Sequence, residues 1–191
     1  MNNSITDTKN YLFQFDQILN DMANKMFSNK ITNNITTDFI TCMIPHHQAA
    51  IFLCQNLLNY TNNKALKEIA QNIIRVQTRG IQEMRQILSS GTGFKNSIMD
   101  SNIYINNYFN ITNTMIMKMV SSVRSGNINL NFTEEMIPHH QGAIDMCNNL
   151  LNYYIDPNLY KLASNIIREQ SIGIRKLREI QNTILDNNLN K

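Results

Sequence analysis

The feature that most restricts the fold of this chain is an internal repeat with an offset of 93 residues. The segment MIPHHQAAIFLCQNLLNY, Met43–Tyr60, matches MIPHHQGAIDMCNNLLNY, Met136–Tyr153, at 14 of 18 positions without a gap. Further along, Ile69–Arg85 matches its counterpart at 9 of 17 positions. Segments this similar adopt the same local structure, so we expect two equivalent halves, residues 1–95 and 96–191, built from one repeated unit.

Each half is predicted to form three helices. Apolar residues recur at steps of three and four, the period of a helix with one buried face. The first helix is indicated by Leu12, Phe15, Ile18, Met22 and Met26, and the others are expected at Thr36–Tyr60, Lys64–Leu88, Tyr104–Ser121, Phe132–Tyr153 and Asn158–Leu185. Alternating strand patterns and hairpin turns are absent from the sequence. Ser89–Asn96 has the composition of a linker, and an all-α bundle follows.

Composition excludes several classes of protein. A chain of 191 residues suits a single domain over residues 1–191. The net charge is only +3 with dispersed Lys and Arg, which argues against nucleic-acid binding. The sequence shows no apolar run of membrane-spanning length and no secretory signal, so we expect a cytoplasmic protein without membrane insertion. Three cysteines suit reduced thiols better than disulfides. A homo-oligomer is left open.

The third helix of each half carries a polar interruption in its apolar seam. The seams are Leu66, Ala70, Ile73, Gln77, Gly80, Met84 and Ile87 in the first half, and Leu159, Ala163, Ile166, Gln170, Gly173, Leu177 and Ile180 in the second. Glycine inside a helix costs about 1 kcal/mol relative to alanine, and a buried amide needs a hydrogen-bond partner. Either the glycine allows close helix packing and Gln77 or Gln170 meets a neighbouring backbone group or histidine, or the glycine and glutamine together make room beside a polar group in the core.

All four histidines of the chain fall in the repeated Met-Ile-Pro-His-His motif. Met43 lies three and four residues before His46 and His47, so its thioether and the two imidazoles share one face of a helix. The second copy places Met136 in the same way before its pair, His139 and His140. Pro45 and Pro138 remove one helical N–H each, and therefore kink or start the helix.

The donor set favours copper over other metals. Thioether and imidazole are soft or borderline ligands that suit copper, particularly Cu(I), better than magnesium, calcium or manganese. Structural zinc would require closely spaced cysteines, and a di-iron centre would require Glu-x-x-His pairs; neither pattern occurs, so zinc and iron are disfavoured. The predicted ligands are Met43, His46, His47, Met136, His139 and His140.

A second group of sulfur-bearing residues is expected near this site. Met22, Met26, Met115 and Met119 align across the repeat and reach the ion or its entry path if the first helix of each half packs against the histidine helix; ordinary core packing fits them equally well. Met146 follows the second histidine pair. Cys54 and Cys147 lie two turns beyond the histidines, where core packing is the better interpretation and a second ion the alternative.

The two histidine segments resemble the signature of a bacterial family known as domain of unknown function 305. The resemblance rests on Asp38–Cys54 and Asn131–Cys147 and extends over nearly the whole chain. It implies a ferritin-like up-down helical bundle made of a repeated unit. Some members of the family are associated with copper binding or copper resistance, and many members are exported. The family's glutamate in the last helix is replaced here by Gly80 and Gly173, which argues against an acid–base role.

Three function classes follow from these patterns. A non-catalytic protein that sequesters or delivers Cu(I) is favoured, because the metal ligands have no acid–base group or substrate cavity evident beside them. A metal-dependent redox enzyme of ferritin-like type is the second class. The third is a metal-free helical interaction module, in which the histidines only tie helices together.

Overall fold

The computed structural model describes residues 4–28, 31–91, 95–122 and 124–189. Six α-helices make up this part of the chain: α1 (Ile5–Phe27), α2 (Ile35–Leu58), α3 (Lys64–Ser89), α4 (Ile98–Val120), α5 (Ile128–Leu150) and α6 (Pro157–Leu189). The described residues contain no strand. The predicted all-α fold of two three-helix halves is therefore confirmed.

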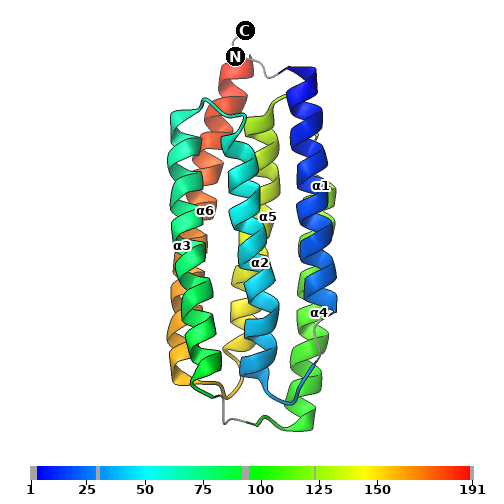
Figure 1. The fold of residues 1–191 in the computed structure, drawn as a ribbon, viewed down its shortest axis with the longest axis vertical. Coiled ribbons are helices and arrows are strands. Elements are labelled where there is room, and N and C mark those ends of the chain that lie inside the picture. Colours follow the sequence, from blue (N-terminus) through cyan, green and yellow to red (C-terminus); the bar gives the residue numbers. More distant parts are fainter. Residues whose placement is uncertain (1–3, 29–30, 92–94, 123, 190–191) are drawn as a thin grey trace.

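The helices run alternately up and down and stand in three layers (Figure 1). The histidine helices α2 and α5 contact each other in the middle layer, and each packs against the two other helices of its own half. Helices α3 and α6 contact each other on one side of this pair, while α1 and α4 lie on the other side. The two halves therefore meet mainly through their histidine helices and their third helices.

Burial of α2 and α5 explains their composition. A helix enclosed between two layers is apolar around most of its circumference, whereas an outer helix shows one apolar stripe. In agreement, α2 buries sixteen of its residues, while α3 buries its predicted seam and leaves the opposite face in solvent. The largest fully buried side chains come from both layers: Tyr11 and Phe15 of α1, Phe39 of α2, Tyr104 and Tyr108 of α4, and Phe132 of α5.

The repeat is preserved in the contacts as well as in the sequence. Asn56 donates from its side chain to the carbonyl of Tyr11 at 2.9 Å, and the repeat-related Asn149 donates to Tyr104 at 3.1 Å. Tyr11 also meets Tyr60 edge-to-face with 6.2 Å between ring centroids. Equivalent residues thus make equivalent contacts in both halves, which gives the molecule an approximate two-fold symmetry.

The predicted helix boundaries differ from the observed ones most at the start of α4, at both ends of α5 and at the end of α6, which continues to Leu189 instead of Leu185. Helix α4 begins at Ile98 instead of Tyr104, because the Ser97 side chain accepts from the Asp100 amide at 3.0 Å and caps the helix earlier. Helix α5 begins at Ile128 after the Asn127 cap, four residues before the predicted start, and ends three residues before the predicted end. Of the predicted linker, Ser89 belongs to α3 and residues 92–94 lie outside the described part.

The two prolines of the repeated motif lie in helix interiors. Pro45 is ten residues from the start of α2 and Pro138 is ten residues from the start of α5, so the alternative that they start their helices is wrong. Each removes one intrahelical hydrogen bond in the turn that carries the histidines. No helix of the described residues is long and apolar enough to cross a lipid bilayer.

Candidate metal site

The four histidines form one continuous row through the middle of the bundle. The ring centroids of His47 and His46 are 6.0 Å apart, those of His46 and His139 are 3.8 Å apart, and those of His139 and His140 are 6.1 Å apart. All four side chains are at most 2% exposed. The row crosses the α2–α5 interface at its centre, so the two motif copies meet instead of forming separate sites at opposite ends.

His46 and His139 bind each other's helix by reciprocal hydrogen bonds. His46 Nε2 lies 3.2 Å from the main-chain carbonyl oxygen of His139, and His139 Nε2 lies 3.2 Å from that of His46. A carbonyl only accepts, so Nε2 carries the proton in both rings and the lone pair is on Nδ1. Metal-binding histidines commonly donate their second ring nitrogen to a carbonyl in this way, which holds the ring in place.

Burial keeps all four imidazoles neutral. Desolvation lowers the pKa of His47 to about 3 and the pKa of His139 to about 4, with the main-chain oxygens of Met43 and His46 respectively opposing part of the shift. The pKa values of His46 and His140 are also lowered, first by desolvation and then by the neighbouring histidines. A neutral imidazole has a lone pair to offer, so every ring is in the ligand-competent form at neutral pH.

The two histidines at the ends of the row, His47 and His140, lie against α3 and α6. The Cδ2–Nε2 edge of His47 lies against Gly80 of α3, where an added Cβ would be 3.0 Å from both atoms. His140 lies against Gly173 of α6 even more closely, at 2.6 Å for Cδ2 and 2.8 Å for Nε2. The two seam glycines are therefore explained by room for an imidazole.

Polar atoms without a protein partner concentrate around this row. Among the described residues, eight buried side-chain N or O atoms lack a hydrogen bond. Six of them are the Nδ1 atoms of the four histidines and the Oε1 atoms of Gln77 and Gln170. Such atoms are costly to bury unless a ligand or water satisfies them. Their clustering is the feature expected of a binding site.

The methionines named in the sequence analysis are all buried in the core, and Met115 of α4 contacts the histidine helix α5. Met22, Met26, Met43, Met115, Met119, Met136 and Met146 are at most 2% exposed. The Met115 thioether lies over Gly142, where an added Cβ would be 2.3 Å from its sulfur. Gly142 follows His139 by three residues, so this sulfur reaches α5 within one turn of a histidine.

The cysteines have surroundings that suit core packing better than metal ligation. Burial raises the pKa values of both Cys54 and Cys147 far above those of an ordinary thiol, so they remain protonated. Cys54 lies near Tyr11 and Cys147 lies near Tyr104, so both thiols are on the tyrosine side of the middle layer. The core interpretation of these two residues is the one we retain.

A buried acid next to the second motif was not identified as a site residue from sequence. Glu135 is 1% exposed and accepts a hydrogen bond from the Tyr11 hydroxyl at 2.5 Å. Desolvation raises the pKa of Glu135 to about 8, which the Tyr11 hydrogen bond and Arg124 partly oppose. Cys42 occupies the equivalent position in the first half. The difference at this position within an otherwise similar motif is the signal available in the sequence.

The fit of these residues to a metal depends on sulfur and imidazole donors. Among the described residues, no group of three or more His, Cys, Asp or Glu side chains is arranged to hold an ion. The four histidines of the row are included in that statement, so any ion held here would need methionine sulfur as well as imidazole donors. Neutral imidazoles in a core that also buries methionine thioethers suit a soft, thiophilic cation.

A family model described as domain of unknown function (DUF305) matches residues 14–88 and again residues 101–181. The chain belongs to the DUF305 family. The two matches fall one in each half, so the chain contains a duplicated DUF305 unit, and the family resemblance inferred from the two motifs is confirmed.

Solved structures of CopM resemble this member of the DUF305 family over most of its length. CopM in the Ag-bound form is 29% identical with a TM-score of 0.59, covering 80% of this chain and 98% of CopM. The Cu(II)-bound form is 28% identical (TM-score 0.59; 78% and 96% covered), and the Cu(I)-bound form is 27% identical (TM-score 0.58; 80% and 98% covered). No curated protein sequence matches the chain significantly.

Proposed function

We propose that this protein binds copper, with a preference for Cu(I), and sequesters or delivers it. The proposed ligands are Met43, His46, His47 and their repeat counterparts Met136, His139 and His140. The observation that carries the proposal is the continuous row of four buried neutral imidazoles, in which His46 and His139 donate from Nε2 and keep their lone pairs on Nδ1. An imidazole in that state offers a lone pair without first losing a proton.

The ligand set explains a preference for the reduced ion. Thioethers bind Cu(I) far better than hard cations, and Met43 and Met136 each lie on the same helix face as a histidine pair. The reciprocal hydrogen bonds of His46 and His139 fix the orientation of these two rings before a metal arrives. Preorganisation of this kind lowers the entropy lost on binding.

The relatives support the same chemistry. CopM has been solved in Cu(I)-bound, Cu(II)-bound and Ag-bound forms, and the resemblance covers nearly all of CopM. An ion range of this type fits a thiophilic site. Transfer of the property to this chain is our proposal, and it extends to the six ligand residues named above.

The decisive experiment is an anaerobic Cu(I) titration against a chromophoric chelator, using protein purified without a polyhistidine tag. We expect one or two tightly bound ions for the wild type. Substitution of His46 and His139 together by alanine should abolish tight binding, since it removes the centre of the row. Met84→Leu is the control, because Leu177 occupies the equivalent position in the other half. Absence of tight binding by the wild type would refute the proposal.

A metal-free helical interaction module is the competing function. The contacts between His46 and His139 favour it, because they join two helices without a metal. These contacts tie α2 to α5 and so serve the fold by themselves. They occupy only Nε2, however, and leave the four Nδ1 atoms and two glutamine oxygens without partners. A purely structural role does not require that arrangement. For a redox enzyme, we find no specific observation that favours it.

A further inference from the structure

Two clefts run between α3 and α6, and the internal repeat relates one to the other. The first, of about 480 Å³, reaches His140 and is lined by Gln77, Gln170 and Gly173. The second, of about 230 Å³, reaches His47 and is lined by the equivalent Gly80 and again by Gln170. Each cleft thus leads from the surface to one end of the histidine row.

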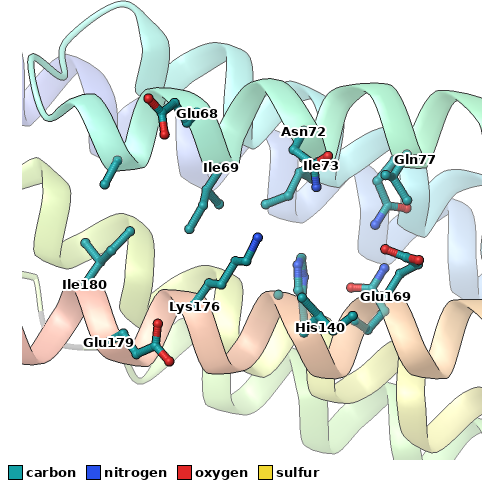
Figure 2. A pocket seen from close by; sticks show the side chains of 15 residues that line it. Glu68, Ile69, Asn72, Ile73, Gln77, His140, Glu169, Lys176, Glu179 and Ile180 are labelled. Atoms are coloured by element: carbon teal, nitrogen blue, oxygen red, sulfur yellow. The ribbon is translucent and has the colours of Figure 1, made fainter.

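The floor of the first cleft is polar and buried. Figure 2 shows Gln77 extending from α3 toward the cleft and the His140 ring standing between α3 and α6. Gln77 is 1% exposed and Gln170 is 3% exposed, and the Oε1 atoms of both lack a hydrogen bond. Two amide oxygens and an imidazole therefore meet at the inner end of this cleft, and all three are acceptors or ligands for a cation.

The two clefts differ in charge, although the repeat makes them similar in shape. Three glutamates, Glu68, Glu169 and Glu179, and one lysine, Lys176, line the cleft at His140. The cleft at His47 is lined by Glu83 and Glu169 together with Arg75, Arg79 and Arg168. The cleft at His140 is thus predominantly acidic, and the cleft at His47 is predominantly basic.

The charge difference arises partly from substitutions at repeat-related positions and partly from Arg75 and Arg168, which are repeat-related to each other and both line the second cleft. Glu68 of the first cleft corresponds to Lys161, which lines a neighbouring cleft that shares Glu83, Leu162 and Asn165 with the second. Glu179 corresponds to Gln86, and Ile172 corresponds to Arg79. Only the Lys176–Glu83 pair changes charge in the opposite sense. The sequence has therefore diverged in the charge of the clefts while it kept the histidines, glycines and glutamines beneath them.

We propose that the acidic cleft at His140 is the path by which a thiophilic cation enters the histidine row, with Glu68 and Glu179 attracting the ion at the mouth and the Gln77 and Gln170 oxygens holding it in transit. This inference rests on the proposed copper-binding function. Clefts lined by one sign of charge concentrate ions of the opposite sign and raise association rates by 10- to 1,000-fold in general. The basic cleft at His47 repels cations and stays out of the loading path.

The chain offers a matched pair of substitutions for a test. Glu68→Lys installs in the acidic cleft the residue found at the repeat-related position 161, and Glu83→Lys installs in the basic cleft the residue found at position 176. Both lie on α3, both change the net charge by the same amount, and both introduce a residue that the other half accommodates. Only their position relative to the two clefts differs.

The experiment measures the rate of loading with silver ion, supplied as its nitrate in chloride-free buffer of low ionic strength. Wild type and variants are mixed rapidly with the ion, quenched at set times with excess chelator, and analysed for bound metal. Glu68→Lys should slow loading about 3- to 10-fold, and the effect should diminish as salt is added. Glu83→Lys should load at the wild-type rate, and Lys176→Gln should load faster. The number of ions bound at equilibrium should be the same in all four proteins.

The outcomes separate this inference from the function on which it rests. Equal slowing by Glu68→Lys and Glu83→Lys, or greater slowing by the latter, would overturn the assigned path while leaving metal binding intact. Absence of silver and Cu(I) binding by the wild type at equilibrium would instead overturn the copper-binding function. Far-UV circular dichroism establishes that each variant is folded before its rate is compared.

Discussion

His46 and His139 stack with 3.8 Å between ring centroids, and each donates from Nε2 to the main-chain carbonyl of the other. They occupy the same position in the two halves of the repeat, 93 residues apart. The contact joins the halves at the middle of the bundle. It also leaves both Nδ1 atoms with their lone pairs, so the same two residues serve the fold and the proposed metal site.

Removal of the His46 or the His139 ring should therefore destabilise the metal-free protein. Once one of these rings is gone, removal of the other should cost less stability. We expect His46→Ala to lower the free energy of unfolding by about 1–3 kcal/mol, because it deletes a buried stack and one hydrogen-bond donor. His139→Ala should do the same. The double variant should lose less than the sum of the two, by about 0.5–1.5 kcal/mol. Urea unfolding of all four proteins measures this; strictly additive losses would show that the rings are not energetically coupled.

Methionine substitutions should affect metal affinity more than stability. Met43→Leu with Met136→Leu keeps the core volume nearly constant, so the cost in stability should stay below about 1.5 kcal/mol each. Cu(I) affinity should fall at least about tenfold, because two thioethers are lost. Competition titration and thermal unfolding of the same samples separate the two quantities. Met84→Leu serves as control, and an equal fall in its affinity would argue against a ligand role for the motif methionines.

Glu135 should make stability fall as the pH rises. Its pKa is about 8 in the folded protein against an ordinary value of 4.5, so the folded state binds the proton more tightly than the unfolded state does. The stabilisation is fully present below pH 4.5 and is lost as the pH rises through 8.

Glu135→Gln cannot ionise and so removes this dependence. The stability of the wild type relative to this variant should decrease between pH 5 and pH 8, by at most about 1.4 kcal/mol per pH unit. Urea unfolding at several pH values measures the difference. Glu134→Gln, at the neighbouring half-buried position, is the matched control. An unchanged difference across this range would mean that Glu135 ionises normally in the folded protein.

Alanine at the two seam glycines should have unequal effects. A Cβ at Gly173 would lie 2.6 Å from His140, whereas a Cβ at Gly80 would lie 3.0 Å from His47. Alanine favours the helix by up to about 1 kcal/mol, which offsets a mild clash but not a severe one. We expect Gly173→Ala to be less stable than Gly80→Ala by about 1–2 kcal/mol in thermal or urea unfolding. Equal stabilities would indicate that the His140 ring moves aside freely.

Local periodicity was sufficient to predict the helices and their buried faces. The seven-residue seam of α3 is buried as expected, including its amide and glycine, because side chains three and four residues apart always share a helix face. Of the two explanations offered for that interruption, both hold in part: Gly80 and Gly173 pack closely, and they do so against histidines. The missed starts of α4 and α5 came from capping residues, Ser97 and Asn127, whose effect precedes the apolar pattern.

The sequence by itself determined that two similar three-helix units exist and that each carries Met and His on one face, since repeats and helical periods are local properties. Only the tertiary structure decided that the two histidine pairs join into one row, because nothing local specifies which helices of the two halves face each other. The same holds for Tyr11 and Glu135, 124 residues apart, and for the opposite charge of the two clefts. Packing brings distant residues together, and their burial then sets their protonation, their unmatched polar atoms and the chemistry available to them.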